Sequence, residues 1–197
     1  GCGKCLSSIF LAREFGVEVW ANDLWIPATD NWQRIREAGL ADRVYPIQAE
    51  ARSLPYAQGF FDAIVCVDSY FYYGTDDLYL KYFHEFVRPG GQIAIATPGV
   101  MQEIDGQLPE HLQPFWGQDC WGWHCADWWQ HLWERTGLVD IETVDVLAEG
   151  WRHWLQCYRV RLACGPRKPG ASDIDTLGID QGQHVALIRM IARRKQI

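Results

Sequence analysis

Two segments near the start of the chain carry residue types suited to holding a nucleoside ligand. Gly1-Cys2-Gly3 forms a predicted turn before a helix, where glycines let backbone N–H groups come close to a polar ligand. Asp23 ends the next predicted strand, with Leu24 beside it, and a carboxylate there can accept hydrogen bonds from ribose hydroxyls. Taken alone, each signal also fits an ordinary tight turn or helix cap.

Two further signals lie later in the chain. Glu50 could meet the amino group of an adenine while Ala51 and its apolar neighbours enclose the ring. Asp68 directly follows an apolar run at 60–67. All these positions come at the carboxyl ends of predicted strands, and ligands of open parallel sheets bind at that edge. Together they predict one cofactor site, formed by Gly1, Cys2, Gly3, Asp23, Leu24, Glu50, Ala51 and Asp68.

The elements that would position these residues alternate between helix and strand. Hydrophobic periodicity and glycine stops predict helices over 6–15, 28–39 and 76–87 and strands over 17–23, 43–48, 60–67 and 92–98. This alternation is typical of a parallel sheet with crossover helices. The continuous apolar run at 60–67 predicts a strand that is buried on both faces.

The second half of the chain continues as part of a single domain over 1–197. The polar, proline-containing segment 99–124 is predicted to be a lid or insertion, and 148–183 a helical and loop insertion before the last strand. Within this half we expect a helix over 126–136, a strand over 138–147, a helix over 151–162, a loop over 165–182 and a closing strand over 184–194.

Composition excludes several classes of protein. With 48% hydrophobic and 22% charged residues, the 197-residue chain is typical of a globular enzyme, and its net charge of −7 argues against binding nucleic acid. The sequence contains neither a run of about 18 apolar residues that could span a bilayer nor a signal peptide. We therefore expect a cytoplasmic protein without a membrane partner.

The seven cysteines are interpreted as reduced thiols, and no metal site is predicted. The alternative is a thiol cluster for a soft metalloid, formed by Cys120, Cys125, Cys157 and Cys164. Composition does not predict the oligomeric state.

Several motifs together resemble the class I S-adenosylmethionine-dependent methyltransferases, in particular the small-molecule group with a ubiquinone/menaquinone-methyltransferase-like core. They are GCGKC at 1–5, Asp23, AEARSLPY at 49–56, Phe61-Asp62 and Pro89-Gly90-Gly91. The resemblance covers about residues 1–147 and the last strand. It implies a Rossmann-like α/β fold, with a mostly parallel sheet, flanking helices and an antiparallel last strand. It also implies S-adenosylmethionine as cofactor and a small-molecule acceptor.

The chain departs from the family pattern in two ways. Cys5 stands where a third glycine is usual, and the family's first strand, with the acid before the glycines, is absent. The resemblance thus implies a fragment of a longer protein. Without the first strand, the strands at 17–22 and 61–67 would each keep an unpaired edge, which puts the activity of the isolated chain in doubt.

The resemblance also implies in-line attack on a sulfonium methyl group by an N, O, S or C atom of the acceptor. We expect Tyr73 and His124 to be catalytic, with His124 as general base if the acceptor must lose a proton. Tyr70, Trp121 and Trp123 are predicted to contact the acceptor.

Two other functions remain open. A catalytically inactive binding or scaffold module would be consistent with Cys5 and the absent strand. A nicotinamide-dependent oxidoreductase would share the glycine turn and Asp23, but would lack the Glu50-Ala51 signal and the hairpin-like end formed by 138–147 and 184–194.

Overall fold

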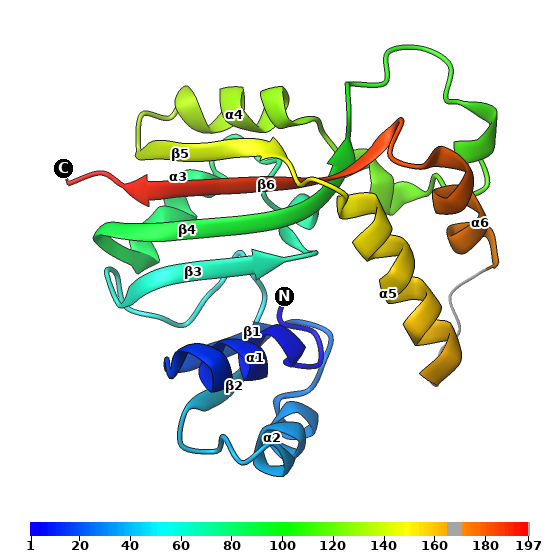
Figure 1. Cartoon of the computed structure of the whole chain (residues 1–197). Coiled ribbons are helices and arrows are strands. Elements are labelled where there is room, and N and C mark those ends of the chain that lie inside the picture. Colours follow the sequence, from blue (N-terminus) through cyan, green and yellow to red (C-terminus); the bar gives the residue numbers. More distant parts are fainter. Residues whose placement is uncertain (165–170, 197) are drawn as a thin grey trace.

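A computed structural model describes residues 1–164 and 171–196, which form six α-helices and six strands (Figure 1). In chain order they are α1 (Leu6–Phe15), β1 (Val19–Asp23), α2 (Ala28–Glu37), β2 (Val44–Gln48), β3 (Phe61–Val67), α3 (Tyr79–Phe83), β4 (Val87–Val100), α4 (Ala126–Glu134), β5 (Val139–Val146), α5 (Gly150–Cys164), α6 (Ala171–Asp180) and β6 (Val185–Arg194). The predicted alternation of helix and strand is confirmed over the first half of the chain.

The strands form two sheets, a parallel pair β1-β2 and a four-stranded sheet in the order β3-β4-β6-β5. β3 and β4 are parallel, and β6 is antiparallel to both of its neighbours, so β3, β4 and β5 all run in one direction (Figure 1). This confirms the α/β class with an antiparallel last strand. The carboxyl ends of β3, β4 and β5 therefore lie at the same edge of the sheet.

β3 is less buried than the apolar run predicted. Val65 is 49% exposed and Val67 47%, whereas Cys66 between them is buried. The reason is topological, because β3 is the edge strand of its sheet and pairs only with β4. Among the described residues, β1 likewise pairs only with β2, so β1 and β3 each keep one open edge. That a further strand, of the kind that precedes the glycine turn in the family, pairs with these two edges stays a prediction.

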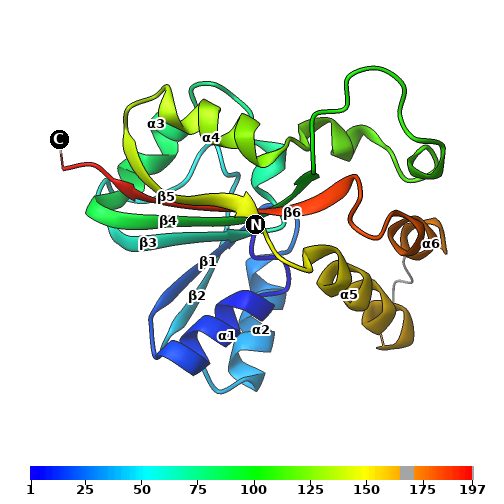
Figure 2. The same ribbon diagram turned by 45° about the horizontal axis from the view of Figure 1, so that its top comes forward.

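Three apolar clusters hold the molecule together. The largest lies where α3 and α4 cover one face of the four-stranded sheet (Figure 2), and includes Tyr70, Trp129, Trp133, Ile93, Ile188 and Met190. We call the second the lid cluster. It joins Leu112 and Trp123 of the 99–124 segment to Leu155 of α5 and Leu177 of α6. The third is small and packs α1 and α2 on β1 and β2.

Three predicted elements differ in the structure. The strand expected over 92–98 is longer, because β4 already begins at Val87 and includes Pro89-Gly90-Gly91. The helix expected over 76–87 is shorter, because α3 is followed at once by a 3₁₀ turn at His84–Phe86. The loop expected over 165–182 contains α6, whose Leu177 is buried in the lid cluster, while 165–170 lie outside the described residues. The segment 165–182 contains many glycines and aspartates, which are typical of loops, so the sequence did not predict this short helix. The 99–124 segment is irregular as expected, with 3₁₀ turns at Glu110–Leu112 and Gln118–Gly122.

No described helix is long and apolar enough to cross a membrane.

Gly91 shows why the Pro89-Gly90-Gly91 motif tolerates no side chain at its last position. A Cβ at Gly91 would lie 2.5 Å from Val87 Cγ1 and 2.6 Å from the backbone oxygen of Asp62. Because the second contact is with backbone, we expect Gly91→Ala to lower the free energy of unfolding by about 1–3 kcal/mol in urea denaturation. The control is Gly178→Ala in α6, where a Cβ meets nothing within 4 Å and helix propensity predicts no loss. Equal effects of the two changes would contradict this account.

Candidate cofactor and acceptor site

The carboxylate of Asp23 fixes the glycine turn to the end of β1. Its Oδ2 accepts a hydrogen bond from the N–H of Gly3 at 2.7 Å, and its Oδ1 accepts two more from Trp25 and Ile26, each at 2.9 Å. Two donors fill Oδ1, whereas Oδ2 keeps one lone pair. The Asp23 side chain is almost fully buried, yet it can still accept one further hydrogen bond.

Hydrogen bonds to β1 and α2 hold the glycine turn in place, and the space beside Gly3 is open. The N–H of Cys2 donates to Asn22 O at 2.8 Å, and Asn31 Nδ2 donates to Gly3 O at 2.9 Å. Gly3 has a φ of 54°, and a Cβ added there would meet nothing within 4 Å. The turn thus leaves free space next to backbone groups, as a bound ligand would require.

The loop that follows β2 lies against the end of β1. Ala49 N donates to Asp23 O at 3.0 Å, and Asn22 Nδ2 donates back to Ala49 O at 3.0 Å. Glu50 is the next residue, so Gly3, Asp23 and Glu50 lie along one rim at the carboxyl ends of β1 and β2. The sequence predicted this juxtaposition.

The loop after β3 completes the rim. A Cβ on Gly1 would lie 2.3 Å from Ser69 Oγ, so the turn lies directly beside this loop, and Figure 1 shows the N-terminus near the end of β3. Asp68 has a φ of 60° and its N–H donates to Ala96 O at 2.8 Å. Burial raises the pKa of Asp68, and the positive charge of Arg161 in α5 partly opposes this shift.

Comparisons with known proteins indicate the family of the chain. A family model described as "Methyltransferase domain" matches residues 1–91. A curated relative, methyltransferase GfsG of Streptomyces halstedii, is 36% identical over 152 residues, which are 74% of this chain and 53% of the relative. The chain belongs to the class I S-adenosylmethionine-dependent methyltransferases. This methyltransferase chain spans about half the length of that curated relative.

Solved structures show the same fold. A putative sarcosine dimethylglycine methyltransferase from Galdieria sulphuraria superposes with a TM-score of 0.77, covering 99% of this chain and 76% of its own, at 18% identity. Geranyl diphosphate C-methyltransferase from Streptomyces coelicolor A3(2) gives a TM-score of 0.74, covering 98% and 68%, at 20% identity.

An arginine that the sequence did not single out links two loops of the candidate site. Arg52 pairs with Glu50 Oε1 at 3.0 Å and donates to Tyr72 O at 3.0 Å. Tyr79 OH also donates to Ala51 O at 3.0 Å. The loops after β2 and β3 are thus tied together. Spacing in the sequence could not reveal Arg52, because its second partner lies 20 residues away.

Tyr70, which the sequence predicts to contact the acceptor, lies in the interior of the structure. Its ring is completely buried in the largest cluster, against Phe83, Trp129 and Trp133. The 3₁₀ turn at Tyr70–Tyr72 directs its first residue inward, whereas Tyr72 is half-exposed and its ring packs edge-on against Trp25 at 5.3 Å.

Tyr73 is also unsuited to the catalytic role predicted for it. Its hydroxyl is buried and hydrogen-bonded to Ser69 Oγ at 3.1 Å and to Cys66 Sγ at 3.3 Å. Burial raises the pKa of Tyr73, so its hydroxyl stays protonated at neutral pH and cannot act as a base.

The two predicted acceptor tryptophans lie in different surroundings. Trp123 is buried in the lid cluster and packs against Phe71 and Trp154, so its surroundings are those of a core residue. Trp121 is 72% exposed, so a ligand can reach it. The two tryptophans are two positions apart in WGWHC, so the sequence could not predict that one is buried and the other exposed.

His124 lies between the end of β4 and α4, held by a carboxylate and an indole. Its Nδ1 lies 3.0 Å from Glu103 Oε2, and its ring stacks on Trp128 at a centroid distance of 3.6 Å. Glu103 Oε1 accepts the N–H of Cys125 at 2.7 Å. A carboxylate at Nδ1 orients an imidazole and leaves Nε2 to act on another group. The sequence did not point to Glu103, because its partner His124 lies 21 residues further along the chain.

Glu103 makes the stability of the fold depend on pH. Burial alone would raise the pKa of Glu103, but hydrogen bonds from the Cys125 N–H and from His124 outweigh it and lower the pKa. A carboxyl whose pKa is lowered by folding contributes stability above the unfolded-chain pKa of about 4.3, and this is lost as pH falls through the folded-state pKa. We expect the difference in unfolding free energy between wild type and Glu103→Gln to shrink below about pH 4.

Urea denaturation from pH 7 downward measures this difference, and the exposed Glu110→Gln provides the control. A difference that is the same at every pH would show that the Glu103 carboxylate is not held by these bonds.

Cys2 and Cys5 form a C-x-x-C pair in the glycine turn, a spacing that the sequence analysis overlooked. Their sulfur atoms lie 3.6 Å apart, and Cys5, at the position of the usual third glycine, has a φ of 62°. The shared hydrogen bond raises the pKa of Cys2 and lowers that of Cys5. Among the described residues, the predicted cluster of later cysteines does not form a metal-ligating group, and the side chain of Cys164 lies outside them.

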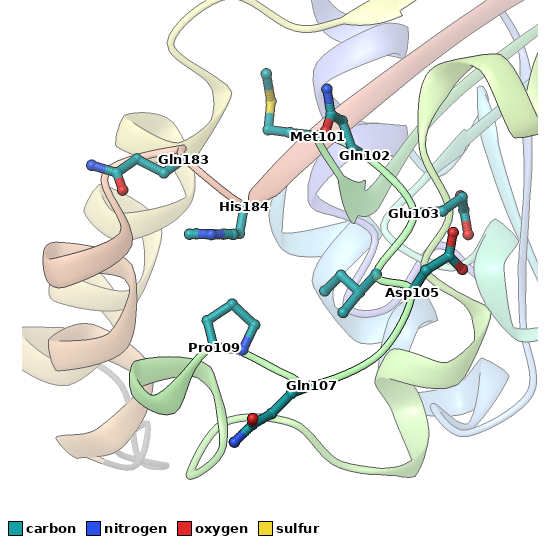
Figure 3. A pocket seen from close by; sticks show the side chains of 9 residues that line it. Met101, Gln102, Glu103, Asp105, Gln107, Pro109, Gln183 and His184 are labelled. Atoms are coloured by element: carbon teal, nitrogen blue, oxygen red, sulfur yellow. The ribbon is translucent and has the colours of Figure 1, made fainter.

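An open hollow of about 470 Å³ lies elsewhere, between the start of the 99–124 segment and the residues before β6 (Figure 3). Glu103 and Asp105 lie on one side of it and His184 and Pro109 on the other. None of the predicted cofactor residues lines this hollow. It is therefore distinct from the rim formed by Gly3, Asp23 and Glu50.

Proposed function

We propose that this methyltransferase transfers the methyl group of S-adenosylmethionine to a small-molecule acceptor. The observation that carries the proposal is the rim on which Gly3, Asp23 and Glu50 meet. Gly3 donates to Asp23 Oδ2, and the backbone of Asp23 accepts from Ala49 beside Glu50. Three chain segments therefore converge at one sheet edge, where ligands of such folds bind.

The residues present fit the cofactor. Asp23 Oδ2 has one free lone pair for a ribose hydroxyl, and the space beside Gly3 is open for the methionine part. Glu50 and the exposed Leu24 would border the adenine. The full proposed set is Gly1, Cys2, Gly3, Asp23, Leu24, Glu50, Ala51 and Asp68.

When bound, the cofactor supplies an electrophilic methyl group on a sulfonium ion. The chain's part is to position the acceptor at about 3–3.5 Å and to exclude water. Tyr72, Trp25 and Trp121 offer accessible aromatic surface for this task, and Tyr72 and Trp25 are in contact. Such faces suit an apolar or cationic acceptor.

Where the acceptor must lose a proton, His124 is our proposed general base. Glu103 would hold its ring and stabilise the charge that it gains. Asp68 is the second candidate, because burial raises its pKa towards the range useful for proton transfer. The variants His124→Gln and Asp68→Asn, compared for turnover against pH, would separate the two.

The test is to incubate the chain with methyl-labelled S-adenosylmethionine and a metabolite extract. We expect label in the small-molecule fraction, and at a cofactor concentration below the wild-type Kd we expect about tenfold less of it with the Asp23→Ala variant. Label in protein or RNA would overturn the proposed acceptor class. Calorimetry with S-adenosylmethionine and with NADH distinguishes the other functions: cofactor binding without transfer supports an inactive module, and binding of NADH alone supports an oxidoreductase.

A further inference from the structure

His111, Asp180 and His184 form a compact group of potential metal ligands outside the cofactor rim. His111 Nε2 and His184 Nδ1 each lie 2.9 Å from Asp180 Oδ1, and one ligand atom from each residue lies within 4.8 Å of the other two. They come from three places in the chain: the 3₁₀ turn at Glu110–Leu112, the end of α6 and the residue directly before β6. The folded chain thus brings together residues up to 73 positions apart.

The carboxylate of Asp180 is rigidly placed. The side chain is completely buried, and its Oδ2 accepts the N–H groups of His184 at 3.2 Å and Val185 at 3.1 Å. Because the backbone holds Oδ2, only Oδ1 faces the two imidazoles. Two imidazole nitrogens and one carboxylate oxygen are a donor set used by zinc and related divalent cations.

The dimensions are close to those of such a site. Bonds of about 2.0–2.1 Å in a tetrahedron place ligand atoms about 3.3 Å apart. The two N···O distances of 2.9 Å would need to open by a few tenths of an ångström. The two imidazole nitrogens lie within 4.8 Å of each other and would need to approach by up to about 1.5 Å, which rotation of the two rings can supply. Moving each ring proton to the other nitrogen would free the inward nitrogens without loss of a proton.

The surroundings leave room for a fourth ligand. His184 lines the hollow of about 470 Å³, which is open to water, and the acidic Glu103 and Asp105 lie across it (Figure 3). A cation approaching through the hollow therefore passes negative charge before it reaches the imidazoles.

We propose that His111, Asp180 and His184 bind a divalent cation of the zinc class, with the fourth coordination position open to the hollow. This site is independent of the proposed methyl transfer. It also revises the expectation from the sequence that the chain has no metal site. The competing explanation is that the three residues are only a hydrogen-bonded clamp between the 99–124 segment and the α6–β6 turn.

Isosteric variants distinguish the site from the clamp. In His111→Gln the amide nitrogen replaces Nε2, and in His184→Asn it replaces Nδ1, so the double variant can keep both hydrogen bonds to Asp180 but loses both imidazoles. The exposed His131→Gln is the matched control. Cobalt(II) is titrated into the chain and followed by its visible absorption, and zinc is then added in competition.

We expect one cobalt per chain, an absorption spectrum of nitrogen and oxygen ligands, and displacement by zinc. Loss of an outer-shell partner already costs 10–100-fold in affinity, so the double variant should bind at least about 100-fold more weakly. The control should bind as the wild type does. If circular dichroism shows the double variant to be unfolded, each single variant is compared instead. Equal binding by the variants, no binding by the wild type, or sulfur-to-metal charge-transfer bands would overturn the proposal.

Discussion

Replacing Asp23 by alanine is expected to weaken S-adenosylmethionine binding at least about tenfold, equivalent to about 1.4 kcal/mol, and to destabilise the fold. Three N–H groups, those of Gly3, Trp25 and Ile26, would lose their acceptor at a buried position. Unsatisfied buried donors cost about 1–3 kcal/mol each but are not additive, so we expect a loss of about 2–4 kcal/mol. Calorimetry measures the affinity, and urea denaturation measures the stability.

The two effects must be separated, because an unfolded variant would bind nothing. Binding is therefore measured at a temperature where circular dichroism shows Asp23→Ala to be folded. The exposed Asp42→Ala has the same change in charge and should alter neither quantity by much. Unchanged affinity in folded Asp23→Ala would remove Asp23 from the cofactor site.

The largest loss of stability is expected for Trp133→Ala. Trp133 of α4 is completely buried in the largest cluster and packs edge-on against Tyr70 at a centroid distance of 5.9 Å. Removing the indole leaves a cavity between α4 and the sheet, and such changes cost about 3–5 kcal/mol. The free energy of unfolding from chemical denaturation is the measurement.

Trp121→Ala removes the same side chain from a position that is 72% exposed. Its stability should stay within about 0.5 kcal/mol of the wild type, since surface changes away from special features have small effects. Because both variants replace tryptophan by alanine, the difference between their unfolding free energies measures the effect of burial. A small loss for Trp133→Ala would mean that the α4 layer does not pack on the sheet as described.

Periodicity and glycine stops were sufficient to predict most elements of the first half. Leu6–Phe15 and its stop at Gly16, which has a φ of 66°, are examples. The meeting of the glycine turn, Asp23 and the loop with Glu50 was also predictable, because parallel strands bring their carboxyl ends to one edge wherever the connecting helices lie. Asp23 and Glu50 could therefore be placed together from local patterns alone.

Side-chain direction within aromatic runs was not predictable. Tyr70, Tyr72 and Tyr73 are chemically alike and adjacent, and only the 3₁₀ turn decides that the first is buried and the second half-exposed. Long-range partners were equally hidden. Glu103 and His124, or His111 and Asp180, meet through the tertiary fold, and no spacing in the sequence encodes those pairs.

The lid cluster has a consequence for how acceptor selectivity could change. Leu112, Trp123, Leu155 and Leu177 belong to three separate segments of the chain but share one apolar interior. A substitution in α6 would thus be transmitted by packing to the residues beside Trp121, without changing any of the proposed ligand contacts. These segments form one packed unit, so under the proposed function mutations that only repack this interior would change the preference for one acceptor over another.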